Sequence, residues 1–82
     1  MNNEVTLTHV HDTGLLLNGA MALQFNDASQ YINAPSNAIL DITAADEIEL
    51  NATEVELNAT TVDLNGNLDV SGTALVTGVL TT

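Results

Sequence analysis

The sequence predicts an all-β fold, assembled as an intertwined homotrimeric β-helix or β-prism fibre from short strands with Asn, Gly and Thr corners. Three observations predict it. A seven-residue repeat carries paired aliphatic residues two positions apart. The 82 residues are 45% hydrophobic, yet only two are aromatic and none is Cys, so neither a large monomeric core nor disulfides can stabilise the chain. Self-association remains as the means of burying apolar surface.

Residues 1–12 are predicted to form the first strand, because polar and apolar residues alternate in a run rich in Thr and Val. One face of this strand would carry Val5, Leu7, His9 and His11. Thr13-Gly14 ends the strand.

Short strands and tight turns are expected up to residue 38. Residues 15–17 form a short apolar run that predicts a buried strand, and Asn18-Gly19 is a common hairpin signal. Residues 20–25 predict a strand, although their composition also tolerates a short helix. Residues 26–29 predict a turn, residues 31–32 a strand, and residues 33–37, with the single proline, a loop.

The repeat begins after this region. Residues 47–53 read Glu-Ile-Glu-Leu-Asn-Ala-Thr, residues 54–60 read Glu-Val-Glu-Leu-Asn-Ala-Thr, and residues 61–67 read Thr-Val-Asp-Leu-Asn-Gly-Asn. Their apolar gaps alternate two and five, whereas a coiled coil needs gaps of three and four. Strands of three to five residues with Asn corners therefore fit better, since Asn accepts left-handed conformations. The aliphatic residues predicted to fill the trimer core are Ile42, Ile48, Leu50, Val55, Leu57, Val62, Leu64, Leu68 and Val70.

The length of the repeat favours three chains over one. A single-chain solenoid with three seven-residue sides needs about 21 residues per coil, and stacked solenoids need several coils. Residues 40–70 would supply little more than one. Three chains around a common axis, each giving one strand per layer, remove this difficulty. The predicted organisation is an attachment or collar region at 1–38, a shaft at 39–72, and a terminal strand or cap at 73–82.

The charge balance excludes several functions. The chain has 11 acidic side chains, no Lys and no Arg, and a formal net charge of −11. Nothing can neutralise phosphates, so nucleic-acid binding and docking on anionic membranes through basic residues are excluded. No catalytic triad, phosphate loop or Cys nucleophile is present, so we expect no enzyme. No signal peptide or transmembrane run is seen.

An acidic ridge is expected outside the shaft. Glu49, Glu56 and Asp63 recur at outward positions of the repeat, where stacked like charges are unfavourable unless salt or loosely bound surface cations screen them. The pattern lacks a calcium-loop spacing and a glycosidase cleft. Asn51-Ala52-Thr53 and Asn58-Ala59-Thr60 match a glycosylation pattern, but we interpret them as corners.

Several stretches resemble the β-rich shaft and collar regions of phage tail fibres, tail spikes and other virion appendages. They are residues 23–27, 31–32, 40–42, the two Glu-x-Glu-Leu-Asn-Ala-Thr repeats and residues 63–73, Asp-Leu-Asn-Gly-Asn-Leu-Asp-Val-Ser-Gly-Thr. The resemblance covers about residues 15–75 and lies in repeated corners rather than in a catalytic signature. It implies a homotrimer with a structural role in a virion, assembled in the bacterial host cytoplasm, with other virion structural proteins as partners and host attachment as its purpose.

His9-Val10-His11 is the one candidate metal site. On a strand, both imidazoles would share the inward face, and three chains would bring six of them together, enough for iron or another transition metal. Phage membrane-piercing spikes carry a His-x-His motif of this kind, though near the C-terminal tip rather than the N-terminal end. Two interpretations of this pair therefore stay open: the metal site of a piercing spike, or two ordinary polar residues at the entrance of the shaft. For the protein as a whole, a capsid-decorating trimer also stays open.

Overall fold

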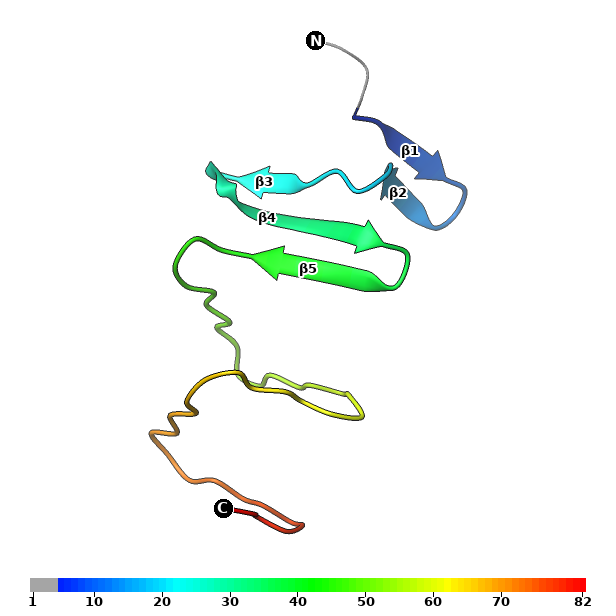
Figure 1. Ribbon diagram of the computed structural model, residues 1–82. Helices are drawn as coiled ribbons and strands as arrows, with labels where there is room; N and C mark the ends of the chain where they lie inside the picture. Colours follow the sequence, from blue (N-terminus) through cyan, green and yellow to red (C-terminus); the bar gives the residue numbers. More distant parts are fainter. Residues whose placement is uncertain (1–4) are drawn as a thin grey trace. The chain divides into compact units, whose positions relative to one another are not determined.

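The structure, a computed structural model, describes residues 5–82. Over this range the protein is all-β, has no helix and forms two small antiparallel sheets (Figure 1). One sheet has two strands and the other has three. The strands are β1 (Leu7–Val10), β2 (Gly14–Leu17), β3 (Leu23–Phe25), β4 (Asp27–Ser36) and β5 (Ile39–Thr43). The all-β prediction is confirmed. Since no helix is present in these residues, none is available to cross a membrane.

β1 and β2 form a hairpin in which Leu7 pairs with Leu17 and Val10 with Gly14. The turn between them is closed by a hydrogen bond of 3.0 Å from the Thr13 amide to the Val10 carbonyl. The predicted strand over residues 1–12 is therefore too long at its C-terminal side, because the turn already begins at residue 11. Its first four residues lie outside the described part of the chain.

β3, β4 and β5 form the second sheet, with β4 in the middle. Asn26 alone separates β3 from β4 and has φ of 67°, a left-handed value that Asn tolerates well. The predicted turn over residues 26–29 is thus shorter than expected. The alternative of a short helix over residues 20–25 is wrong, because residues 23–25 form β3.

The loop predicted at residues 33–37 is wrong. β4 continues through Pro35 to Ser36, and only Asn37 and Ala38 turn the chain into β5. A proline cannot donate to a strand ladder, and the pairing of β4 with β5 shifts register between Asn33 and Ser36, at the proline. The irregular ladder is what lets the proline remain in the strand.

Asn18-Gly19 does not close a hairpin. Gly19 has φ of 71°, which glycine adopts without strain, but β2 and β3 belong to different sheets. Asn18 instead extends the first hairpin, because its amide donates to the Thr6 carbonyl at 3.0 Å and its side-chain oxygen lies 2.6 Å from the Thr8 hydroxyl, which donates to it. A turn does form at this point, but it connects the two sheets instead of closing a hairpin.

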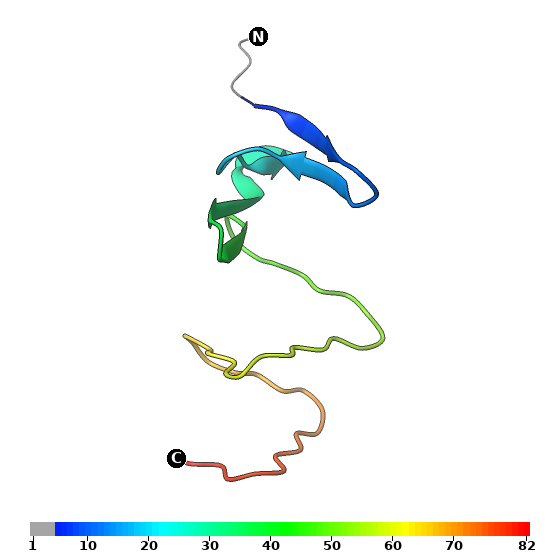
Figure 2. The same cartoon turned by 90° about the vertical axis from the view of Figure 1, so that its right-hand side faces the viewer.

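The chain divides into two compact units, residues 1–51 and 52–82. Beyond β5 it contains no strand up to residue 82, and both views show a winding trace without arrows (Figures 1 and 2). Strands require hydrogen-bonded neighbours, which this part of a single chain does not supply. β5, the first stretch of the predicted shaft, pairs instead with β4.

No residue in the described part of the chain is buried. A folded protein of 8.6 kDa is expected to expose about 4700 Å², whereas this chain exposes 8073 Å². The difference is about 3400 Å² on each chain, whereas obligate protein interfaces bury about 2000–5000 Å² counted over both partners, so the excess is ample for an obligate interface. A chain that is 45% hydrophobic and leaves its apolar side chains in water needs partners to cover them.

Candidate functional site

The predicted core residues, Ile42 to Val70, are all exposed in the single chain. Their exposure repeats with the sequence. The first aliphatic residue of each seven-residue repeat is 50–52% exposed (Ile48, Val55 and Val62), and the second is 58–67% exposed (Leu50, Leu57 and Leu64). Equivalent residues with equal exposure indicate a backbone that repeats its geometry. We call these six side chains the repeat face.

The backbone of the same stretch lacks hydrogen bonds within the described part of the chain. From residue 45 to residue 82, no backbone group forms a hydrogen bond with another described backbone group. Bends nevertheless recur at residues 45–46, 52–53, 60, 65–66, 71–72 and 77–78. Extended segments with regular bends and unpaired amides and carbonyls are suited to pair with other chains, because buried backbone groups require partners.

The bends lie where the repeat predicts corners, within two residues of Asn51, Asn58 and Asn65. Asn accepts left-handed conformations, but these corners do not use them. Among the described non-glycine residues, only Asp12 and Asn26 have positive φ. The corners are open bends without a closing hydrogen bond, so they do not require a left-handed residue.

A second period, which the sequence prediction missed, follows the first. Gly66, Gly72 and Gly78 recur every six residues, each at a bend and each preceded by a polar residue. None of the three has positive φ, and a Cβ placed on any of them would meet no atom within 4 Å. The glycine spacing in the sequence was the signal that could have revealed the change from seven to six residues.

The two histidines do not share a strand face. His9 lies in β1 opposite Leu15, whereas His11 lies in the turn that follows. The Nε2 atom of His11 lies 3.1 Å from the Oδ2 atom of Asp12, and both side chains are exposed. The argument that placed both imidazoles on one face is therefore wrong, because β1 ends at Val10. Metal binding at His9 and His11 stays a prediction that this geometry does not support.

The acidic ridge remains without an organised cation site. Glu49, Glu56 and Asp63 lie between the aliphatic residues of the repeat face, in the extended segments. Within residues 5–82, no group of three or more His, Asp or Glu side chains is arranged to hold a metal ion. Loosely bound surface cations on the ridge stay a prediction.

Two hydrogen bonds from Ser29 perturb the pKa of Asp27. The Ser29 amide donates to its Oδ1 atom at 2.9 Å, and the Ser29 hydroxyl donates to the same atom at 2.8 Å. These two bonds, the backbone one first, lower the pKa of Asp27 below its usual value. They favour the folded chain above the unfolded pKa, and this contribution is lost as the pH falls through the lowered folded pKa.

Ser29→Ala is expected to raise the pKa of Asp27 part of the way toward its usual value, since the backbone donor remains. A pH titration of the Asp27 carboxyl carbon by NMR measures this. Ser36→Ala is the control, because the Ser36 hydroxyl accepts only from the Ala38 amide at 3.3 Å and should leave Asp27 unchanged. An unchanged Asp27 pKa in Ser29→Ala would contradict the assignment.

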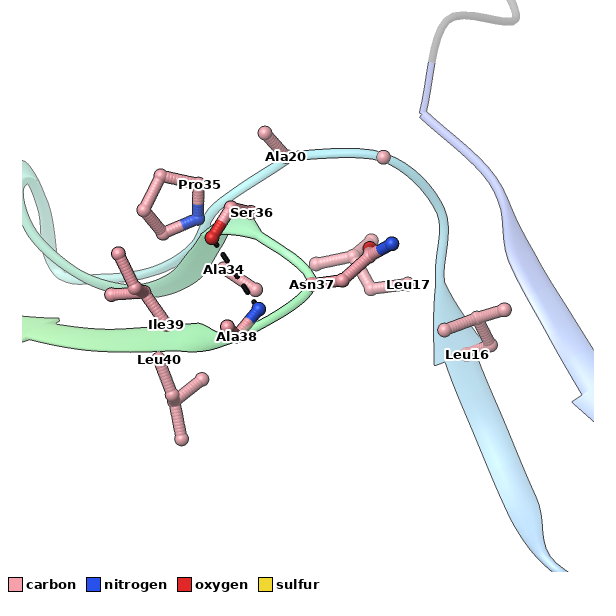
Figure 3. A pocket seen from close by; sticks show the side chains of 11 residues that line it. Leu16, Leu17, Ala20, Ala34, Pro35, Ser36, Asn37, Ala38, Ile39 and Leu40 are labelled. Atoms are coloured by element: carbon pink, nitrogen blue, oxygen red, sulfur yellow. Dashed lines mark hydrogen bonds between the residues drawn. The ribbon is translucent and has the colours of Figure 1, made fainter.

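An open hollow of about 730 Å³ lies beside the β4–β5 turn (Figure 3). Leu16 and Leu17 of β2 line it on one side, and Pro35, Ile39 and Leu40 line it on the other. A smaller hollow of about 230 Å³ adjoins it and includes Asn33, whose Oδ1 atom is covered and accepts no hydrogen bond. The side chains that line the two hollows are mainly aliphatic, and none of them is Asp, Glu or His.

Comparison of the chain with protein-family models, with curated proteins and with solved structures gave no match. The features of the chain that bear on its function are therefore the repeat face and the backbone beside it, which lacks hydrogen bonds to other described residues.

Proposed function

We propose that the protein is a homotrimeric structural segment of a phage-like tail fibre, spike or head appendage that takes part in host attachment. The observation that carries the proposal is the repeat face together with its unpaired backbone. Three chains around one axis would bury the aliphatic pairs in successive layers, and each chain would supply the hydrogen bonds that the next one lacks. The virion role follows from the resemblance to phage appendage shafts.

The magnitudes favour such an assembly. Each aliphatic side chain that leaves water stabilises the folded state by about 1.5–3 kcal/mol. The repeat face offers six of them per chain, and three-fold symmetry multiplies this number. The function is mechanical: a chain that is interlaced with two others cannot leave without breaking its pairings with both. A carboxylate-covered outside keeps such a fibre soluble and prevents it from aggregating sideways.

Amide hydrogen exchange tests the architecture. In the single chain, the amides of residues 47–70 are free and would exchange as fast as those of an unfolded peptide. We expect slow exchange across this stretch in the purified protein, because interchain ladders protect these amides. The β1–β2 hairpin serves as the internal reference, since its amides are bonded within one chain. Fast exchange over 47–70 would refute the intertwined shaft.

Immunoelectron microscopy tests the virion role. Antibodies against residues 54–67 should label the tail or head appendages of phage particles that encode this chain. Labelling of the capsid shell with no labelling of appendages would favour the capsid-decorating trimer. Absence of the chain from purified particles would overturn the proposed function.

A further inference from the structure

The six-residue period allows the segments that begin at Gly72 and Gly78 to be compared, position by position, with the segment that begins at Gly66. Counting from each glycine, Leu68 corresponds to Leu80, and Val70 corresponds to Val76. Their exposures match: 71% and 74% for the leucines, and 45% and 53% for the valines. These residues therefore continue the apolar face of the shaft beyond Gly72, with the same face of the chain turned to the axis.

The outward positions do not match. Leu75 corresponds to Asp69, and Val79 corresponds to Asn67. Leu75 is 91% exposed and Val79 is 90% exposed, more than any other large apolar residue in the described part of the chain. A trimer that buries the inward residues would leave these two uncovered. We call Leu75 and Val79 the outer apolar patch; each trimer would carry three copies of it.

The charge distribution indicates what can cover this patch. All 11 acidic side chains lie between residues 4 and 69, so residues 70–82 carry no charged side chain. Two copies of the trimer would repel each other along the acidic shaft but not along this segment. An anionic bilayer is a poor occupant, because the chain has no basic side chain to attract it to such a surface.

We propose that residues 73–82 form a contact surface for a second copy of the same trimer, through the outer apolar patches of both. The proposal rests on the proposed homotrimer. A contact made by the same segment of both partners is self-complementary. When two trimers lie on one axis with their residues 73–82 facing each other across a two-fold axis, all three patches of each trimer are used, and the assembly closes at six chains. Because it contains no charges, the contact should persist in high salt, where hydrophobic association is not weakened.

The test measures molar mass by light scattering over a range of protein concentrations. The wild-type mass should rise from three chains to six. Leu75→Asp with Val79→Asn places at both positions the residues that the repeat beginning at Gly66 has there, so the shaft should still form. We expect this double variant to remain at three chains, with the association constant lowered at least about tenfold. Asn67→Asp, a charge added outside the patch, should still reach six chains.

A wild-type mass of three chains at every concentration would overturn the proposal, as would a double variant that still doubles. Flotation of the wild type, but not of the double variant, with phosphatidylcholine vesicles would also overturn it and would assign the patch to lipid. A mass of one chain would refute the homotrimer itself, and so is distinguishable from failure of the contact alone.

Discussion

Leu57→Asp is expected to convert the trimer into monomers. Leu57 lies at the centre of the repeat face, and its side chain is 67% exposed in the single chain. In the trimer, three copies would meet in one layer. The substitution removes about 1.5–3 kcal/mol of apolar burial per chain and also brings three carboxylates into that layer. Because all three chains bear this cost in the same layer, the total is large compared with the net free energy of unfolding of a small protein.

Leu57→Met is the matched control, because it keeps the apolar character and nearly the volume of the side chain, a change that usually costs less than about 1.5 kcal/mol. It should retain the trimer with a modestly lower melting temperature. Sedimentation velocity separates the two outcomes. A heat-resistant trimer of Leu57→Asp would show that the repeat face does not form the core.

Neutralising the acidic ridge is expected to stabilise the assembled protein at low ionic strength. Glu49→Gln, Glu56→Gln and Asp63→Asn together remove like charges that stack along the shaft, where each unfavourable neighbour costs about 0.2–1 kcal/mol. For a domain of this size, 1 kcal/mol corresponds to about 4–8 °C in melting temperature. The gain should shrink in 1 M salt, where screening shortens the reach of a charge to about 3 Å.

Asp12→Asn is the control for the single variant Glu56→Gln, since both remove one negative charge and Asp12 lies in the exposed turn between β1 and β2, outside the repeat sequence. Thermal unfolding at low and high salt measures the difference between them. Equal melting temperatures for the two variants at low salt would mean that the ridge charges do not stack. Metal ions would then not be needed to explain how the shaft tolerates them.

The all-β class and the positions of the corners could be predicted from the sequence, because the repeat of aliphatic pairs with Asn and Gly is a local pattern. The length of β4 could not be predicted. Pro35 normally signals a loop, and only pairing with β5 shows that an irregular ladder accommodates it. The left-handed Asn26 likewise shortens a turn that composition made longer.

The candidate site shows the same division. Period-2 patterning assigns each aliphatic residue of the repeat to one side of the chain, and their role as a trimer core stays a prediction. The shared face predicted for His9 and His11 was wrong, because alternation alone could not show that the strand ends at Val10. Whether an exposed face is covered depends on other chains, and no pattern within one chain fixes their number.

Molar mass by size exclusion with light scattering tests the central claim most directly. The measurement is made at low salt and at the lowest workable concentration, with and without a chelator. A mass of three times 8.6 kDa under both conditions is the predicted result. A trimer that dissociates on chelation would assign its cohesion to metal at His9 and His11. A mass of 8.6 kDa in the untreated protein would contradict the intertwined trimer.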